Sequence, residues 1–176
     1  ALRDVIKEFA RHGARQICLV NGHFENSWFI IEAIDLALRE LRWDRIEDVK
    51  IVVLSYWDFV GPEALAQLYP NGFPGWELEH GGVLETSLML ALHPALVHLH
   101  AAVDVAPATF PPYDVYPVKP EWTPCSGTLS SPKEASVEKG HILLEVCTKG
   151  IVAALRSVFS ARPVVADAPD TLARAS

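Results

Sequence analysis

Two short apolar runs constrain the fold more than any other feature of this sequence. They are Ile17 to Val20 and Ile51 to Leu54, and each is continuous and only a few residues long. Such runs are typical of strands that are covered on both faces, as in a parallel sheet. Between them, apolar residues from Phe29 to Leu41 recur at helical spacing along one wide face. This alternation of strand and helix predicts an α/β fold with a parallel sheet.

Helical patterns are also present on either side of these runs. One covers Leu2 to Phe9, and a second runs from Val83 to Leu92 and stops before a proline. A third is opened by a capping-box pattern at Ser131 and extends to about residue 159. Residues 104–132 contain seven prolines, which is a long irregular connection and therefore either functional or packed against a neighbouring subunit.

The number of strands is small for a buried sheet. Only a weak third strand is expected, from Val97 to Val103, where His98 and His100 would share a solvated face. Two parallel strands cannot sustain a sheet that is buried on both faces. We therefore expect a partial α/β domain over residues 1–160 that lacks its amino-terminal strands, followed by a poorly ordered tail over residues 161–176.

Composition excludes several classes of function. The net charge is -7 and no cluster of Lys or Arg occurs, which argues against a nucleic-acid partner. No apolar stretch approaches the roughly 20 residues of a membrane span. Three cysteines are too few to suggest a disulfide framework at this length. These features predict a cytoplasmic protein with a small-molecule substrate and no membrane partner.

Polar residues follow the first apolar run in the segment NGHFEN. His23 and Glu25 lie two residues apart there, so on extended backbone their side chains can face the same way. An imidazole nitrogen with a carboxylate oxygen suits Zn or Mn. The alternative is a surface histidine beside a glutamate that complements the dipole of the next helix. Because two ligands do not make a metal site, spacing alone favours the alternative.

Two further clusters lie after the second apolar run. Trp57 is placed to stack on a flat ring, although a large core residue is an equally good interpretation. Farther on, WELEHGGVLETS contains Trp76, Glu77, His80 and Glu85. A histidine can transfer protons near neutral pH when a carboxylate orients it, and the glycines allow close approach of the backbone to a ligand. A loop histidine beside a carboxylate at a helix start is an equally good interpretation.

Taken together, NGHFENSWFIIEAIDLALRELR, SYWDF, GFPGWELEHGGVLETSLMLALHP, ATFPPYDVYP and GTLSSPKEAS resemble the creatininase family. The similarity covers residues 1–158 and is expected to correspond to the carboxyl-terminal part of the family's domain. It implies a three-layer α/β/α sandwich with a mostly parallel sheet, two divalent metal ions (Zn, Mn or both) and a homohexamer. The implied activity is the interconversion of creatinine and creatine, in which a metal-held hydroxide attacks the ring amide.

The resemblance also implies roles for individual residues. His23 and Glu25 match metal ligands, Trp57 and Trp76 match aromatic residues that close over the substrate, and Glu77 matches a substrate-contacting acid. His80 matches the residue that protonates the departing ring nitrogen, and Glu85 would support it. Phe24 departs from the pattern, since family members that act on creatinine have Tyr at this position. One hydroxyl contact with the substrate is thereby lost.

A second departure concerns the metal site, because nothing in this sequence matches the upstream ligands of the family, a Glu-x-His element and an Asp. Two alternatives follow. The chain can belong to an amidohydrolase that acts on another small amide, or it can be a catalytically incomplete α/β module whose proline-rich segment mediates assembly.

Overall fold

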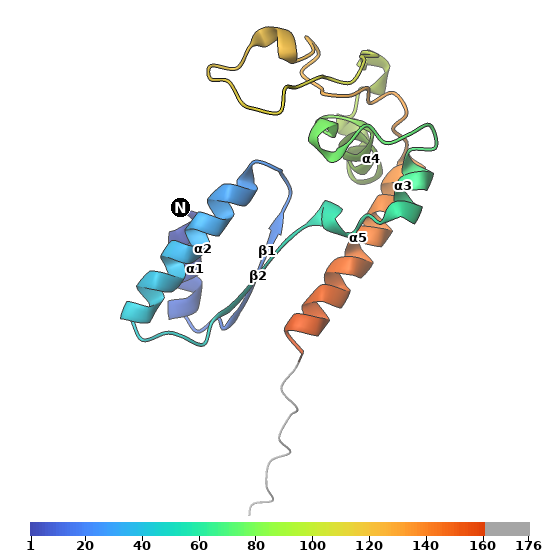
Figure 1. The fold of residues 1–176 in the computed structure, drawn as a ribbon. Helices are drawn as coiled ribbons and strands as arrows, with labels where there is room; N and C mark the ends of the chain where they lie inside the picture. Colours follow the sequence, from blue (N-terminus) through green and yellow to red (C-terminus); the bar gives the residue numbers. More distant parts are fainter. Residues whose placement is uncertain (161–176) are drawn as a thin grey trace, which may run out of the picture. The chain divides into compact units, whose positions relative to one another are not determined.

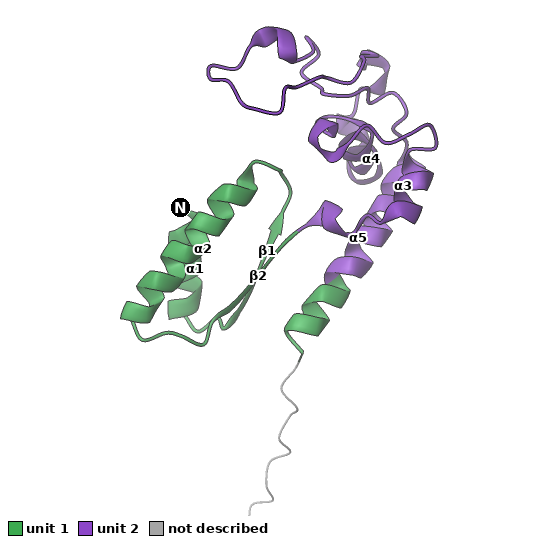
Figure 2. Cartoon of the chain, viewed as in Figure 1, with its two compact units in different colours: residues 1–54, 152–176 green, residues 55–151 purple. Residues whose placement is uncertain are grey.

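The computed structural model describes residues 1–160 and divides them into two units. Among the described residues, unit 1 comprises residues 1–54 and 152–160, and unit 2 comprises residues 55–151 (Figure 2). The expected tail over residues 161–176 lies outside the described residues. A single domain over residues 1–160 stays a prediction, and each unit is described below by itself.

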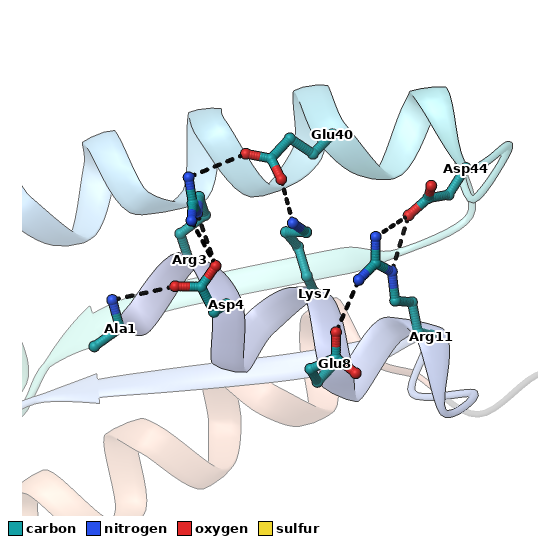
Figure 3. Close-up of polar contacts among 8 residues, drawn as sticks. All are labelled: Ala1, Arg3, Asp4, Lys7, Glu8, Arg11, Glu40 and Asp44. Atoms are coloured by element: carbon teal, nitrogen blue, oxygen red, sulfur yellow. Dashed lines mark hydrogen bonds and ion pairs between the residues drawn. The ribbon is translucent and has the colours of Figure 1, made fainter.

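Unit 1 contains the two expected strands and the helix between them. In chain order it has α1 (Leu2–Arg11), β1 (Gln16–Asn21), α2 (Asn26–Trp43) and β2 (Lys50–Ser55), whose last residue is already assigned to unit 2. β1 and β2 are neighbours in a two-stranded sheet and run in the same direction (Figures 1 and 3). The α/β class with a parallel sheet is therefore confirmed.

The core of unit 1 lies between the two helices and one face of the sheet. Ile6 of α1, Ile17 of β1 and Ala37 of α2 are buried together there. The strands are less covered than the apolar runs predict, since Val20 of β1 is 57% exposed and Val53 of β2 is 42% exposed. The expectation of strands covered on both faces is thus met only in part within the described unit.

Ion pairs join α1 to α2 along their length (Figure 3). The Lys7 ammonium donates to the Glu40 carboxylate, and the Arg11 guanidinium lies 2.7 Å from Asp44. The hydrogen bond from Lys7 lowers the pKa of Glu40 below its ordinary value. These contacts fix the register of the two helices that carry the buried residues Ile6 and Ala37.

Unit 2 is mainly helical. It contains η1 (Tyr56–Phe59), α3 (Pro62–Leu68), η2 (Trp76–Leu78), α4 (Val83–Leu92), three further short 3-10 helices (η3, Pro94–Leu96; η4, Leu99–Ala101; η5, Pro120–Trp122) and most of α5 (Val137–Val158). Its core joins Leu68 of α3, Leu84 of α4 and Leu143 of α5, all fully buried. Gly140 lets α5 approach α4 closely, because a Cβ there would lie 2.1 Å from the carbonyl oxygen of Ser87.

Two elements of unit 2 differ from expectation. The prediction of a weak strand from Val97 to Val103 is wrong. The N–H of Val97 donates to the carbonyl oxygen of Pro94, and the N–H of Ala101 donates to that of His98, so these donors are used in local 3-10 turns. The long last helix begins at Val137, several residues after the capping-box pattern. Ser136 provides the cap instead, since its Oγ accepts the N–H of Lys139 at 3.2 Å.

None of the helices within residues 1–160 has the length and hydropathy that a membrane span requires.

Candidate functional site

The loop after β1, residues 21–26, is organised by one buried amide and is called the His23 loop below. Asn21 is 3% exposed, and its Oδ1 accepts the backbone N–H of His23 at 3.1 Å and the Nδ2 of Asn26 at 3.3 Å. Its own Nδ2 donates to Ser27 Oγ at 3.3 Å. Because the first turn of α2 and the loop share this amide, the path of the chain from β1 into α2 is fixed.

The His23 loop brings the two predicted metal ligands together. Nε2 of His23 lies 2.7 Å from Oε2 of Glu25, and their side chains are 48% and 63% exposed. The expected reason was an extended backbone, but Glu25 has φ -67° and ψ -14°, which is helical. The side chains therefore converge across a turn that leads into α2. Phe24, between them in sequence, is 53% exposed. Its ring lies edge to face with that of Trp28, with 5.7 Å between the ring centroids.

The donor chemistry of this pair fits a divalent metal ion in part. Nitrogen and oxygen donors that converge on one point, half-exposed to solvent, suit Zn or Mn. Within residues 1–160, however, no three His, Cys, Asp or Glu side chains come together as a metal-binding group. The described residues of this chain thus offer two donors, which is fewer than a catalytic metal ion requires.

Aromatic rings in unit 2 form contacts with one another. Trp57 is half-buried in η1 and packs edge to face on Tyr56 at 5.0 Å. Trp76 packs on Phe73 at 4.9 Å, and Phe73 packs on Tyr69 at 5.0 Å. Each tryptophan therefore has part of its surface in contact with the protein and part exposed to solvent. Trp76 also packs against the hydrophobic core of unit 2.

Glu77 is exposed beside Trp76. Its carboxylate covers Gly75, which has φ +120°, and a Cβ at that glycine would lie 2.7 Å from Oε1 of Glu77.

His80 and Glu85 belong to a turn over residues 79–85, called the His80 turn below. His80 is exposed, and its carbonyl oxygen accepts the N–H of Leu129 at 3.0 Å. The carboxylate of Glu85 accepts the N–H of Gly81 at 2.6 Å. Glu85 thus holds the peptide that directly follows His80, whereas direct support of the imidazole by Glu85 stays a prediction.

The glycines of the His80 turn make room for protein side chains, whereas the sequence suggested close approach to a ligand. A Cβ on Gly81 would lie 2.9 Å from Cγ2 of Thr128. One on Gly82 would lie 2.6 Å from Oε2 of Glu79 and 2.7 Å from Oγ of Ser130.

Sequence reasoning missed Glu79, which is the most connected polar residue of the turn. Its Oε1 accepts the N–H of Leu84 at 2.6 Å and that of Glu85 at 3.3 Å, and Oε2 accepts the hydroxyl of Tyr69. Burial raises the pKa of the Glu79 carboxyl and also that of the Tyr69 hydroxyl. A glutamate shortly before a glycine at a helix start is a signal that could have found it, since such a helix lacks a side-chain cap of its own.

Comparisons with known proteins agree with one another. The sequence model of the creatininase family, described as creatinine amidohydrolase, matches residues 1–155. The creatinine amidohydrolase of Pseudomonas putida is 64% identical over 159 residues, which is 90% of this chain and 61% of the relative. This chain therefore spans less than two thirds of that relative's length.

Solved structures give the same result. A creatininase variant of the Zn-Zn type has a TM-score of 0.89 and 63% identity, over 91% of this chain and 62% of the other. A creatininase variant complexed with creatine has a TM-score of 0.88 and 63% identity, over 91% and 63%. These matches do not confirm the expectation that the chain corresponds to the carboxyl-terminal part of the family's domain.

Proposed function

The chain belongs to the creatininase family, and from this premise we propose that it serves in a metal-dependent cyclic amidohydrolase that interconverts creatinine and creatine. The observation that carries the proposal is the convergence of His23 and Glu25, with 2.7 Å between nitrogen and oxygen. The residues of the His80 turn and the two partly exposed tryptophans add support. So do the similar proteins, one named creatinine amidohydrolase and one complexed with creatine.

His23 and Glu25 would hold metal in this proposal, as part of a site for two Zn or Mn ions. When bound, such ions polarise a carbonyl oxygen and lower the pKa of water. The chain's own residues then have distinct tasks. Trp57 and Trp76 offer flat apolar faces to a planar ring, and Glu77 offers an exposed carboxylate to the cationic side of the substrate. Phe24 fills its position without a hydroxyl group.

His80 would move the proton that the ring nitrogen needs when the amide bond breaks. Its side chain is exposed, and an imidazole is the side chain best suited to proton transfer. Glu85 holds the following peptide through Gly81, which limits the positions that the imidazole can reach. A histidine at a defined position contributes about 10²- to 10⁴-fold to such a reaction.

Substitution of His80 tests this proposal directly. His80→Ala should lower creatinine turnover by about 10²- to 10⁴-fold while circular dichroism stays unchanged. His141→Ala, at an exposed position of α5, is the matched control and should leave turnover as it is. Full turnover in His80→Ala would overturn the proton-transfer role.

Metal content separates the hydrolase from the alternative of a catalytically incomplete module. After dialysis against metal-free buffer, about two Zn or Mn ions per chain are expected by elemental analysis. The absence of a group of three candidate ligands within residues 1–160 favours the alternative. Little bound metal would support the catalytically incomplete module. Turnover of another small amide in place of creatinine would support the alternative substrate, which Phe24 suggests because it lacks the hydroxyl group of the family's Tyr.

We also propose that the protein forms a homo-oligomer, a hexamer by family resemblance, and acts in the cytoplasm. Cys18, Cys125 and Cys147 are all free thiols, which agrees with a reducing compartment.

A further inference from the structure

A partly buried carboxylate caps the helix that follows the His80 turn. α4 begins at Val83, and the residue before it, Gly82, has no side chain with which to cap the first N–H groups. Glu79 supplies the missing acceptor, because its Oε1 accepts the N–H groups of Leu84 and Glu85 at 2.6 and 3.3 Å. These are the second and third residues of the helix, whose N–H groups a capping Ser or Asp would ordinarily bind.

The second oxygen of this carboxylate accepts a hydrogen bond from a residue at the end of another helix. The hydroxyl of Tyr69, which follows α3, donates to Oε2 of Glu79. Tyr69 is 7% exposed and belongs to the core of unit 2. The carboxylate is therefore bound at both oxygens, to α4 on one side and to the core on the other.

Hydrogen bonds connect Glu79 to the backbone next to His80 through Glu85. Glu79 binds the backbone N–H of Glu85, and the side chain of Glu85 binds the backbone N–H of Gly81 at 2.6 Å. Gly81 directly follows His80, whose carbonyl oxygen is bound by the N–H of Leu129 at 3.0 Å. The peptide that joins His80 to Gly81 is thus bound at both its C=O and its N–H, and the N–H contact leads through Glu85 to the carboxylate of Glu79.

We propose that Glu79 is a positioning residue, which fixes the backbone of Glu85 and, through Glu85, the backbone that carries His80. The inference rests on the function proposed for His80 and deepens it by naming the group that holds the turn. A change at Glu79 should act on the catalytic step, because it alters the location of the proton donor and leaves the aromatic faces in place.

Three variants of the full protein test this role. Glu79→Ala removes the acceptor, Glu79→Gln keeps an oxygen for the N–H groups of Leu84 and Glu85, and Tyr69→Phe frees the second oxygen of the carboxylate. We expect Glu79→Ala to lower kcat by about tenfold to a hundredfold with little change in KM. Glu79→Gln should restore most of kcat, and Tyr69→Phe should have an intermediate effect.

Two measurements that need no turnover accompany the kinetics. In Glu79→Ala the amides of Leu84 and Glu85 should exchange hydrogen faster, and the titration of the His80 imidazole, followed by NMR, should shift. Both should return toward wild type in Glu79→Gln. If Glu79→Ala does not fold, the same measurements on Tyr69→Phe decide, and unchanged exchange and titration there would overturn the proposal.

The outcomes also separate this role from the proposed function. Unchanged amide exchange in Glu79→Ala would overturn the capping geometry, and altered exchange with wild-type kcat and an unshifted His80 titration would overturn the positioning role. If the wild-type protein does not turn over creatinine, the proposed function fails. Exchange and the His80 titration would then still decide whether Glu79 positions the turn.

Discussion

The His23 loop and the His80 turn look alike in sequence but are built in opposite ways. Each has a histidine beside glycine and a glutamate close to the start of a helix. In the His23 loop the organising group is a neutral amide, Asn21, and the His23–Glu25 pair is half-exposed. In the His80 turn the organising group is a partly buried carboxylate, Glu79, which binds two backbone N–H groups and a tyrosine hydroxyl.

The glycines of the two segments make the difference clear. A Cβ added to Gly22 would meet no atom within 4 Å, whereas one added to Gly82 would meet Glu79 and Ser130 at 2.6 and 2.7 Å. Neither glycine has a positive φ angle, so backbone strain is not a factor at either position. The comparison teaches that the backbone of the loop has open space at Gly22, whereas side chains pack closely against the backbone of the turn at Gly82.

The largest expected effect is therefore at Gly82. Gly82→Ala should destabilise the protein by about 1–3 kcal/mol, because the new methyl group overpacks a carboxylate that three hydrogen bonds hold in place. Ser130 adds to this, because its buried Oγ would lie 2.7 Å from the same methyl group. The free energy of unfolding from urea denaturation measures the effect.

Gly22→Ala is the matched control and should change the free energy of unfolding by less than about 0.5 kcal/mol. Equal effects of the two substitutions would break the comparison. It would also be broken if Gly22→Ala were the more destabilising of the two.

The sequence alone predicts the features that depend on local signals. The bounds of α4, Val83 and Leu92, are as expected, because periodicity and the following Pro94 are local signals. The two strands each extend one residue beyond the apolar runs at both ends. The convergence of His23 and Glu25 also follows from their separation by two residues, although a turn produces it in place of an extended strand.

What the sequence could not provide depends on contacts between distant residues. The carboxylate of Glu79 is held by the hydroxyl of Tyr69, which is ten residues away in sequence. The space next to Gly82 is filled by Ser130, which lies far along the chain. The start of α5 at Val137 is similarly fixed by Ser136, whose N–H donates to Ser87 Oγ at 3.2 Å. The local capping signal is stronger at Ser131, which Glu134 follows three residues later, and the tertiary contact with Ser87 is what favours Ser136.

A smaller effect is expected from the charge of Glu79. Burial raises the pKa of its carboxyl above the ordinary 4.5, so the folded state binds this proton more tightly than the unfolded state does. This contribution to stability is fully present below the ordinary pKa and is lost as pH rises through the raised pKa. Glu79→Gln does not titrate, so its stability relative to wild type should increase with pH across that window and then level off.

Urea denaturation of wild type and Glu79→Gln at a series of pH values measures this difference. Glu25→Gln, in the exposed pair of the His23 loop, provides the comparison from the other segment. A difference between wild type and Glu79→Gln that does not vary with pH, or that falls as pH rises, would mean that the hydrogen bonds from Tyr69 and α4 outweigh burial.

The smallest effect on stability is expected at the His23–Glu25 pair itself. Exposed ion pairs contribute about 0–1 kcal/mol, so Glu25→Gln should leave the metal-free protein almost as stable as wild type. Asp35→Asn is the matched control, because the Asp35–Arg39 pair also has a separation of 2.7 Å and similar exposure in the same unit. The two variants should differ instead in metal content, which Glu25→Gln lowers and Asp35→Asn leaves unchanged. A large loss of stability in Glu25→Gln would show that the pair is structural, and equal metal content in both variants would remove Glu25 from the metal site.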